Sequence, residues 1–194
     1  GRKAIVCASS RGLGRGCAEA LAQAGCEVIV NGLDADRLAR TADEIARRTG
    51  AKVTPVAANV STREGQEALL AACPNPDILV NNNGGPPRRD YHELDRDAMI
   101  DGVIQNMISP IEMIQKVADG MADRGFGRIV NISVSFIKFP QVNFAHSHAA
   151  RLALSGAIAS MVRECVPDNV TMNTVCPGFF DTDALHTNLH NHAR

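Results

Sequence analysis

Short apolar runs alternate along the chain with longer stretches in which apolar residues recur every three or four positions. The apolar run Lys3–Ala8 predicts a strand, and residues 12–24 carry small and apolar side chains at helical spacing. The same pair of patterns follows, with a strand over Glu27–Asn31 and then a helix that Asp34 caps and Gly50 ends. Strand and helix therefore alternate from the first residues onward.

The remainder of the chain continues this alternation. The predicted elements are a strand over about 52–58, a helix opened by the capping box Ser61–Glu64 and ending near Cys73, a strand over Asp77–Asn81, a long helix from about Asp95 to Ala122, a strand over Arg128–Ser133, a helix over about 146–165 and a strand over Val170–Val175. Strands buried on both faces and joined by helices predict an α/β fold, a doubly wound parallel sheet of the Rossmann type. We expect the strand order 3-2-1-4-5-6 and three layers, αβα.

The chain has 194 residues, which we interpret as a single domain of this Rossmann type over 1–194. The regular pattern stops abruptly in the polar tail from Ala184, so we expect the domain to be incomplete at its C-terminal end. The net charge is −1, which offers no electrostatic case for nucleic acid or for an anionic membrane as a partner. No apolar run approaches the roughly 20 residues that a membrane-spanning helix needs.

Six cysteines are scattered along the chain, without a Cys-x-x-Cys pair or a cluster of metal-ligand spacing. They predict unpaired thiols in a reducing compartment, so we expect a cytoplasmic protein with no metal site. The tail contains His186, His190 and His192 at helical spacing. A solvated helix edge is the favoured interpretation of these three residues, with a metal site as the alternative.

A glycine-rich turn follows the first predicted strand. The segment Ala8-Ser9-Ser10-Arg11-Gly12-Leu13-Gly14 leads directly into the first predicted helix. Glycines at such a place let the backbone approach a pyrophosphate, whose charge the N-terminus of the helix then favours. A turn of this kind also occurs for purely structural reasons, so by itself it is a weak signal.

Three further segments accompany this turn. Residues 81–84, Asn-Asn-Asn-Gly, end the fourth predicted strand; Pro177–Thr182 follows the sixth; and Asn106 lies on the long helix. In this order and spacing the whole chain resembles the short-chain dehydrogenase/reductase family. The usual Thr-Gly-x-x-x-Gly-x-Gly of that family is matched by Cys7–Gly14 with its first two positions changed. The usual Asn-Asn-Ala-Gly is matched with Asn83 in place of Ala.

The resemblance implies a nicotinamide dinucleotide cofactor. By it, Asn82 and Gly84 flank the adenosine side, Asn59 and Val60 lie near the adenine, and Thr182 lies near the nicotinamide amide. The residues that we expect at the cofactor are Ser9, Ser10, Arg11, Gly12, Leu13, Gly14, Asn31, Gly32, Leu33, Asn59, Val60, Asn82, Asn83, Gly84, Arg151, Pro177, Gly178 and Thr182.

The end of the second predicted strand bears on the choice between NAD and NADP. An acidic residue there would bind the ribose 2′-hydroxyl and repel a 2′-phosphate, but this chain has Gly32 between Asn31 and Leu33. Nothing there excludes the phosphate, and Arg11 could pair with it. Leu33 stands where NADP-preferring members of the family often carry Arg. The sequence favours NADP, with NAD as the alternative.

The catalytic residues of the resembled family are changed in this chain. In that family a Tyr transfers the substrate proton, a Lys four residues later assists it, a Ser polarises the carbonyl and an Asn anchors a water relay. The spacing places Ser147 at the Tyr, Arg151 at the Lys, and Val134, between Ser133 and Ser135, at the Ser. A serine hydroxyl is a far weaker acid than a phenol, and arginine keeps its proton at neutral pH, so the usual relay cannot operate.

Asn106 is retained on the long helix. Pro110, four residues later, lacks the N–H that would bond the carbonyl of residue 106, which leaves that carbonyl able to hold a water; the alternative is a proline kink with Asn106 facing solvent. His146 and His148 flank Ser147, and imidazole is a competent acid near neutral pH, although ordinary surface or interface histidines are the favoured interpretation. The residues that we assign to catalysis are Asn106, Ser133, Ser147 and Arg151.

Two functions remain open. The first is an NAD(P)-dependent oxidoreductase with a remodelled site that reduces a small carbonyl compound or oxidises an alcohol, and the fold, the glycine turn and Asn106 favour it. The second is a catalytically silent sensor or scaffold that binds the dinucleotide, which the loss of Tyr and Lys favours. Residues 95–122 and 146–165 carry apolar side chains on more than one face, and the resembled family pairs subunits through these helices. We therefore expect a homodimer or homotetramer.

Overall fold

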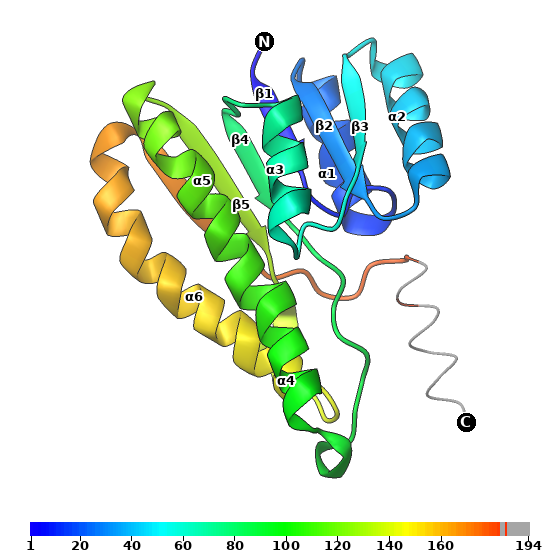
Figure 1. Ribbon diagram of the computed structural model, residues 1–194, viewed down its shortest axis with the longest axis vertical. Coiled ribbons are helices and arrows are strands. Elements are labelled where there is room, and N and C mark those ends of the chain that lie inside the picture. The colour runs from blue at the N-terminus through cyan, green and yellow to red at the C-terminus, as the bar shows by residue number, and fades with distance from the viewer. Residues whose placement is uncertain (183–184, 186–194) are drawn as a thin grey trace.

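The computed structural model describes residues 1–182 and 185. Its strands are β1 (Lys3–Val6), β2 (Glu27–Gly32), β3 (Val53–Ala57), β4 (Ile78–Asn81), β5 (Gly127–Ile132) and β6 (Val170–Val175). They form one sheet in the order β3-β2-β1-β4-β5-β6, and every neighbouring pair is parallel (Figure 1). The predicted doubly wound sheet and its strand order are therefore confirmed.

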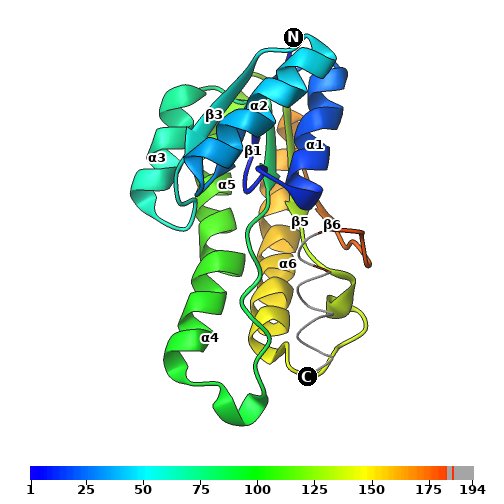
Figure 2. The same ribbon diagram turned by 90° about the vertical axis from the view of Figure 1, so that its right-hand side faces the viewer.

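Helices cover both faces of the sheet (Figure 2). The helices are α1 (Gly12–Gln23), α2 (Ala35–Thr49), α3 (Arg63–Ala72), α4 (Arg96–Val103), α5 (Ser109–Asp123) and α6 (Ala145–Cys165), with short 3-10 turns at Tyr91–Glu93, Ser135–Ile137 and Val166–Asp168. Helices α1 and α2 pack on one face, and α3, α5 and α6 pack on the other. This is the predicted three-layer arrangement.

The first strand shows how the sequence divides between the two cores. Ile5 and Cys7 pack with residues of α3, α5 and α6, whereas Ala4 and Val6 pack with residues of α1 and α2. All four side chains are buried. Because successive side chains of a strand point to opposite faces, an uninterrupted apolar run supplies both cores at once. The apolar runs of the sequence thus fix the strands in the centre of the molecule.

Two helix starts illustrate how well local signals locate the elements. Asp34 caps α2, since its carboxylate accepts the backbone N–H three residues later at 2.9 Å, as predicted. The predicted capping box at Ser61 is wrong by one residue, because Thr62 is the cap and accepts the N–H of Gly65 at 3.1 Å. The N–H of Ser61 donates instead to the side chain of Asn59 at 3.0 Å. Ser61 therefore belongs to an Asx turn that precedes the helix.

The long predicted helix is interrupted in its middle. Between α4 and α5 the chain makes a π turn over Ile104–Ile108, and the N–H of Ser109 donates to the carbonyl of Ile104, five residues back. The hydroxyl of Ser109 donates to the same carbonyl at 2.7 Å. Pro110, which has no N–H to donate, follows directly, and such a residue favours this change of hydrogen-bond register. Together α4 and α5 form one long rod beside α6 that extends past the carboxyl edge of the sheet (Figure 1).

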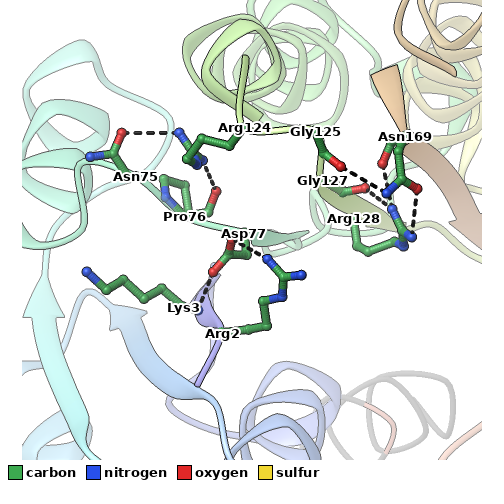
Figure 3. Close-up of polar contacts among 10 residues, drawn as sticks. All are labelled: Arg2, Lys3, Asn75, Pro76, Asp77, Arg124, Gly125, Gly127, Arg128 and Asn169. Atoms are coloured by element: carbon green, nitrogen blue, oxygen red, sulfur yellow. Dashed lines mark hydrogen bonds and ion pairs between the residues drawn. The ribbon is translucent and has the colours of Figure 1, made fainter. Parts of the chain in front are cut away.

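At the opposite edge of the sheet, basic side chains are held by neighbouring oxygens (Figure 3). Asp77 accepts from the side chain of Arg2 at 3.1 Å and from the backbone N–H of Lys3 at 2.9 Å. Arg124 donates to the carbonyl of Pro76 at 2.8 Å, and Arg128 donates to the carbonyl of Asn169 at 2.7 Å. These contacts join the amino ends of β1, β4, β5 and β6. In the part of the chain that the structure describes, no helix is long and apolar enough to cross a membrane.

Candidate functional site

The turn between β1 and α1 brings backbone close to backbone. Gly12 has a φ of 57°, a conformation that side chains disfavour. A Cβ on Gly14 would lie 2.3 Å from the carbonyl oxygen of Ala8, so the first turn of α1 can approach the end of β1 only with glycine there. Arg11 precedes the helix without making a side-chain cap, and Leu13 is half-buried. The backbone N–H groups at this uncapped helix start suit the pyrophosphate of a dinucleotide.

Two of the predicted cofactor residues, Ser9 and Asn31, make hydrogen bonds to the backbone of this turn and of the strands beside it. The buried hydroxyl of Ser9 donates to the carbonyl of Val6 at 2.7 Å and accepts the N–H of Asn31 at 2.9 Å. The amide of Asn31 accepts the N–H of Ala8 at 3.2 Å and donates to the carbonyl of Ala58 at 2.9 Å. These polar atoms fix the shape of the turn. A direct contact of either side chain with the cofactor stays a prediction.

The carboxyl end of β2 carries no acidic side chain. The strand ends at Gly32, and a Cβ on this residue would lie 3.1 Å from the hydroxyl of Ser10. Leu33 follows and is 76% exposed. The next acidic residue, Asp34, is turned toward α2 as its cap. Arg11 lies in the same glycine turn and is exposed. The position at the end of β2 that would approach the ribose thus carries no carboxylate.

The loops that follow β4 and β6 reach the same turn. The side chain of Asn82 donates to the carbonyl of Ala8 at 3.2 Å. Thr182 lies beside Gly12, where an added Cβ would be 3.7 Å from its methyl group. Gly84 faces open space. The structure thus gathers segments that are far apart in the sequence around one glycine turn, as the resemblance implied.

Asn83 differs from the alanine usual in the family, and its side chain has a defined place. Its amide nitrogen donates to the hydroxyl of Ser61 at 2.8 Å and to the carbonyl of Gln105 at 3.1 Å, within the π turn. Its amide oxygen accepts the N–H of Gly84 at 2.8 Å. Asn83 therefore connects the loop after β3 and the π turn to the loop after β4. Nearby, Asn59 is exposed and Val60 is buried.

A cavity of about 20 Å³ lies between the carboxyl ends of β4 and β5 and the helices α5 and α6. This volume holds roughly one water molecule. The lining residues are Val60, Asn81, Asn82, Asn83, Gln105, Asn106, Ser109, Pro110, Asn131, Ile132, Arg151 and Leu154. Asn106 is 4% exposed, and its side chain donates to the carbonyl of Gly102 at 3.3 Å. Asn106 thus lines this cavity and does not face solvent, which excludes the solvent-facing alternative.

Ser147 and Arg151 lie one turn apart on α6, against the end of β5. The Nε of Arg151 donates to the hydroxyl of Ser147 at 3.3 Å, and its Nη1 donates to the carbonyl of Ile132 at 3.1 Å. Both partners are uncharged. Burial lowers the pKa of Arg151 from 12.5 to about 10, so the guanidinium remains protonated at neutral pH. The structure therefore brings a partly buried positive charge together with a hydroxyl beside the cavity.

Ser133 and Ser135 both follow the end of β5 and have different surroundings. The register between β5 and β6 continues without a bulge to the pair Ile132–Val175. Ser133 follows, 7% exposed, and its hydroxyl has no hydrogen-bond partner among the described residues. Ser135 begins a 3-10 turn, and its N–H donates to the carbonyl of Pro177 at 2.8 Å. The next residue along the β6 loop, Gly178, has open space around it.

The two histidines beside Ser147 are buried within the chain, so they are not the surface residues that one part of the favoured interpretation, surface or interface histidines, expected. His146 is 1% exposed, and its Nε2 lies 3.0 Å from the carbonyl oxygen of Pro87. His148 stacks on Phe144 with ring centroids 6.0 Å apart and meets the edge of Phe136 at 6.2 Å. The start of α6 is covered by the loops after β4 and β5, and periodicity within α6 could not reveal that cover. The tail histidines, His186, His190 and His192, lie outside the described residues.

Within residues 1–182 and 185, no group of three or more His, Cys, Asp or Glu side chains is arranged to hold a metal ion. The doubly wound sheet, its uncapped glycine turn and the loops gathered around that turn define a dinucleotide-binding α/β protein. A model of the family described as short chain dehydrogenase matches residues 2–193. The chain belongs to this family.

Several relatives are oxidoreductases. The chain is 34% identical over 191 residues to the 3-oxoacyl-(acyl-carrier-protein) reductase of Aquifex aeolicus (strain VF5), covering 94% of this chain and 75% of the relative. It is 28% identical over 195 residues to the NADPH-dependent reductase BacG of Bacillus subtilis (strain 168), covering 98% and 75%. Its structure is similar to that of a variant of actinorhodin polyketide ketoreductase with NADPH, with a TM-score of 0.93 and 28% identity, covering 99% and 76%.

The family and these relatives identify the chain as an NAD(P)-dependent oxidoreductase of the short-chain type. None of these relatives is named as a sensor or scaffold, so the comparisons lend no support to the second function. The positions that the resemblance assigns to the family's Tyr and Lys are those of Ser147 and Arg151. The reaction of this chain has to be argued from those two residues.

Proposed function

We propose that this protein is an NADP(H)-dependent reductase of a small carbonyl compound, also able to oxidise the corresponding alcohol, in which Ser147 and Arg151 replace the usual Tyr and Lys. The observation that carries the proposal is the pair formed by the Nε of Arg151 and the hydroxyl of Ser147, 3.3 Å apart, beside the cavity that Asn106 lines. The NADPH-dependent reductase and the ketoreductase among the relatives support the direction of the reaction.

In this proposal Ser147 and Arg151 have different roles at the substrate oxygen. A nicotinamide cofactor, when bound, supplies hydride transfer, so the protein has to orient the substrate and manage charge and proton. The hydroxyl of Ser147 accepts from Arg151 and so directs its own proton away from the guanidinium, toward a substrate oxygen. Arg151 stabilises the negative charge that develops on that oxygen. Because a serine hydroxyl is a weak acid, charge stabilisation contributes more than proton donation does.

Asn106 and Ser133 have supporting roles in this proposal. Asn106 holds a water in the cavity of about 20 Å³, from which a proton reaches Ser147. Ser133 is buried next to the end of β5, and its hydroxyl has no hydrogen-bond partner among the described residues. A polar group of a ligand can supply that partner. The buried position of both side chains supports these roles.

The preference for NADP rests on the end of β2. Gly32 offers no carboxylate to repel a 2′-phosphate, Leu33 is exposed, and Ser10 and Arg11 lie on the adjoining turn. An arginine pairs readily with a phosphate. The NADPH named for two of the relatives supports this choice over NAD.

The exposed apolar residues of the α4–α6 region support a homodimer or homotetramer. Met99 and Ile108 are each 38% exposed, Ile100 is 47% exposed and Leu152 is 50% exposed. Covering such side chains with a second copy of the chain removes them from water. The six cysteines are all free, which supports a place in the reducing cytoplasm.

The test combines cofactor titration with an activity screen. Purified protein is titrated with NADPH and with NADH, followed by the fluorescence of the reduced nicotinamide, and is then assayed against a panel of aldehydes and ketones. We expect tighter binding of NADPH than of NADH, with the difference reduced in Arg11→Ala. We also expect a kcat about 10²-fold lower in Ser147→Ala, the scale observed when one donor to a reacting oxygen is removed.

Ser160→Ala is the matched control, since Ser160 is exposed on the same helix. Its kcat should equal that of the unaltered protein. NADPH binding without turnover of any carbonyl compound would favour the sensor or scaffold. The absence of binding to either dinucleotide would contradict the cofactor assignment itself.

A further inference from the structure

At the carboxyl edge of the sheet, Arg151 carries a positive charge that has no ion pair within residues 1–182 and 185. Arg151 is partly buried there, and its hydrogen bonds go to the hydroxyl of Ser147 and the carbonyl of Ile132. No Asp or Glu is among the described residues that line the adjoining cavity. At the amino edge, by contrast, Arg2 is paired with Asp77 (Figure 3). Arg151 is therefore a partly buried cation whose hydrogen-bond partners in the described chain are neutral.

A second guanidinium lies on the segment between β4 and α4. Arg88 is half-buried and lies over the ring of Phe144, with its guanidinium carbon 4.8 Å from the ring centroid. Its Nε is buried without a hydrogen-bond partner among the described residues. Phe144 in turn stacks on His148 at the start of α6. Arg88 is thus held in place by an aromatic contact, with a buried donor left unused.

The two arginines belong to one region of the molecule. The segment that carries Arg88 passes beside Arg151, because a Cβ on Gly85 would lie 3.8 Å from the Nη2 of Arg151. The adjacent Arg89 is paired with Asp95 at 3.5 Å, so its charge is compensated. No ion pair to Arg88 or Arg151 occurs within residues 1–182 and 185. Arg88 and Arg151 are therefore two half-buried guanidinium groups in this region without an ion pair among the described residues.

The two histidines near Arg88 and Arg151 have lowered pKa values. Burial lowers the pKa of His148, and the charges of Arg151 and His146 lower it further. Burial also lowers the pKa of His146; the hydrogen bond to Pro87 opposes this, and Arg89 adds to it. No carboxylate raises the pKa of either imidazole. Burial is the main cause in both cases, so the neutral form of each imidazole is favoured.

A guanidinium withdrawn from water without an anionic partner is costly to a protein unless a ligand supplies the missing charge. The planar fork of arginine matches a carboxylate, to which it donates two parallel hydrogen bonds. We propose that the substrate of this site is a short oxo acid, with Arg88 holding its carboxylate and Arg151 holding the reacting carbonyl oxygen. This inference rests on the proposed reductase function and specifies its substrate class.

The experiment compares acids with their uncharged methyl esters. Pyruvate against methyl pyruvate, and acetoacetate against methyl acetoacetate, are titrated by calorimetry into protein saturated with NADP⁺, so that no reduction takes place. We expect at least one acid to bind about tenfold more tightly than its ester, the scale of one charge-assisted hydrogen bond. Arg88→Gln should reduce that ratio toward one, because Arg88 holds the carboxylate. Arg151→Gln should weaken the binding of acid and ester by similar factors, because both carry the carbonyl that Arg151 holds.

Arg128→Gln is the matched control, because Arg128 lies at the opposite edge and donates to Asn169. It should retain the full preference for the acid. Since Arg88 lies on a half-buried loop position, its variant tests the inference even if the Arg151 variant does not fold. A second readout is the ratio of kcat/KM for acid and ester with NADPH, which should change in the same direction.

Equal affinities for acid and ester, or no binding of either acid, would overturn the inference. So would an acid preference that persists in Arg88→Gln. Each of these results, obtained with protein that binds NADP⁺, leaves the proposed reductase function standing. A protein that fails to bind NADP⁺ would contradict the proposed function instead.

Discussion

The glycine turn at the start of α1 supports a quantitative test of the packing around the cofactor site. In Gly14→Ala the added methyl group would lie 2.3 Å from the carbonyl oxygen of Ala8 and 2.9 Å from the amide nitrogen of Asn82. Atoms at ordinary contact are about 3.5–4 Å apart, so the helix has to move away from β1 by about 1 Å. Overpacking of this kind costs about 1–3 kcal/mol. The hydrogen bond from Asn82 to Ala8 contributes about 1 kcal/mol more if it is lost.

Alanine also favours a helix over glycine by about 1 kcal/mol, which offsets part of this cost. The expected result for Gly14→Ala is therefore a free energy of unfolding about 1–3 kcal/mol lower than in the unaltered chain. Gly16→Ala, in the same helix, is the matched control, because an added Cβ there meets no atom within 4 Å. That variant should be more stable by about 0.5–1 kcal/mol.

Both free energies can be measured by urea denaturation followed by far-ultraviolet circular dichroism, which suits a chain without tryptophan. The two substitutions add the same methyl group to the same helix, so their opposite signs isolate the contact with Ala8. A Gly14→Ala protein as stable as the unaltered chain would refute this account of the turn. The same conclusion would follow if Gly14→Ala and Gly16→Ala changed the stability by the same amount.

Three further predictions concern single residues. Ala8 has a φ of 45°, so Ala8→Gly should relieve strain and raise the free energy of unfolding by about 0.5–1 kcal/mol, and a decrease in urea denaturation would contradict this. Asn83→Asp keeps the acceptor for Gly84 but loses the donor to Ser61 and Gln105; it should lower the free energy of unfolding by about 1–2 kcal/mol, and unchanged stability would count against the link. Burial raises the pKa of Cys7 to about 12, so a thiol reagent near neutral pH should label it only in denaturant; mass spectrometry detects this, and rapid labelling of the folded protein would disprove it.

Much of the fold follows from the sequence because the determining interactions are local. The apolar runs that supply both cores predicted the strands, and the spacing of apolar residues predicted the helices. Asp34 predicted the start of α2. Each of these signals acts within a few residues. The right-handed crossover rule then leaves few arrangements for alternating strands and helices, which explains the correct strand order. The glycine turn could be recognised for the same reason. Gly12 allows a positive φ and Gly14 allows a close approach to Ala8, and both requirements arise within a few residues of chain.

The sequence predicted only part of the interruption of the long helix. Pro110 indicated that one helical hydrogen bond would be missing, but not that the chain would adopt a π turn. The amide of Asn83, which is 22 residues from Gln105, donates to that turn, and the amide of Asn81 donates to the carbonyl of Pro110 at 3.1 Å. These partners come from the end of β4. Their identity depends on how the sheet places β4 beside the helix.

The sequence by itself determined the elements, their order, the glycine turn and the positions that Ser147 and Arg151 occupy in the family's pattern. Only the tertiary structure decided that His146 and His148 are buried and that Arg88 lies at the same edge of the sheet as Arg151. The physical reason is the range of the interactions. Periodicity and capping act over one or two turns, whereas burial and charge compensation depend on which distant segments the fold brings together.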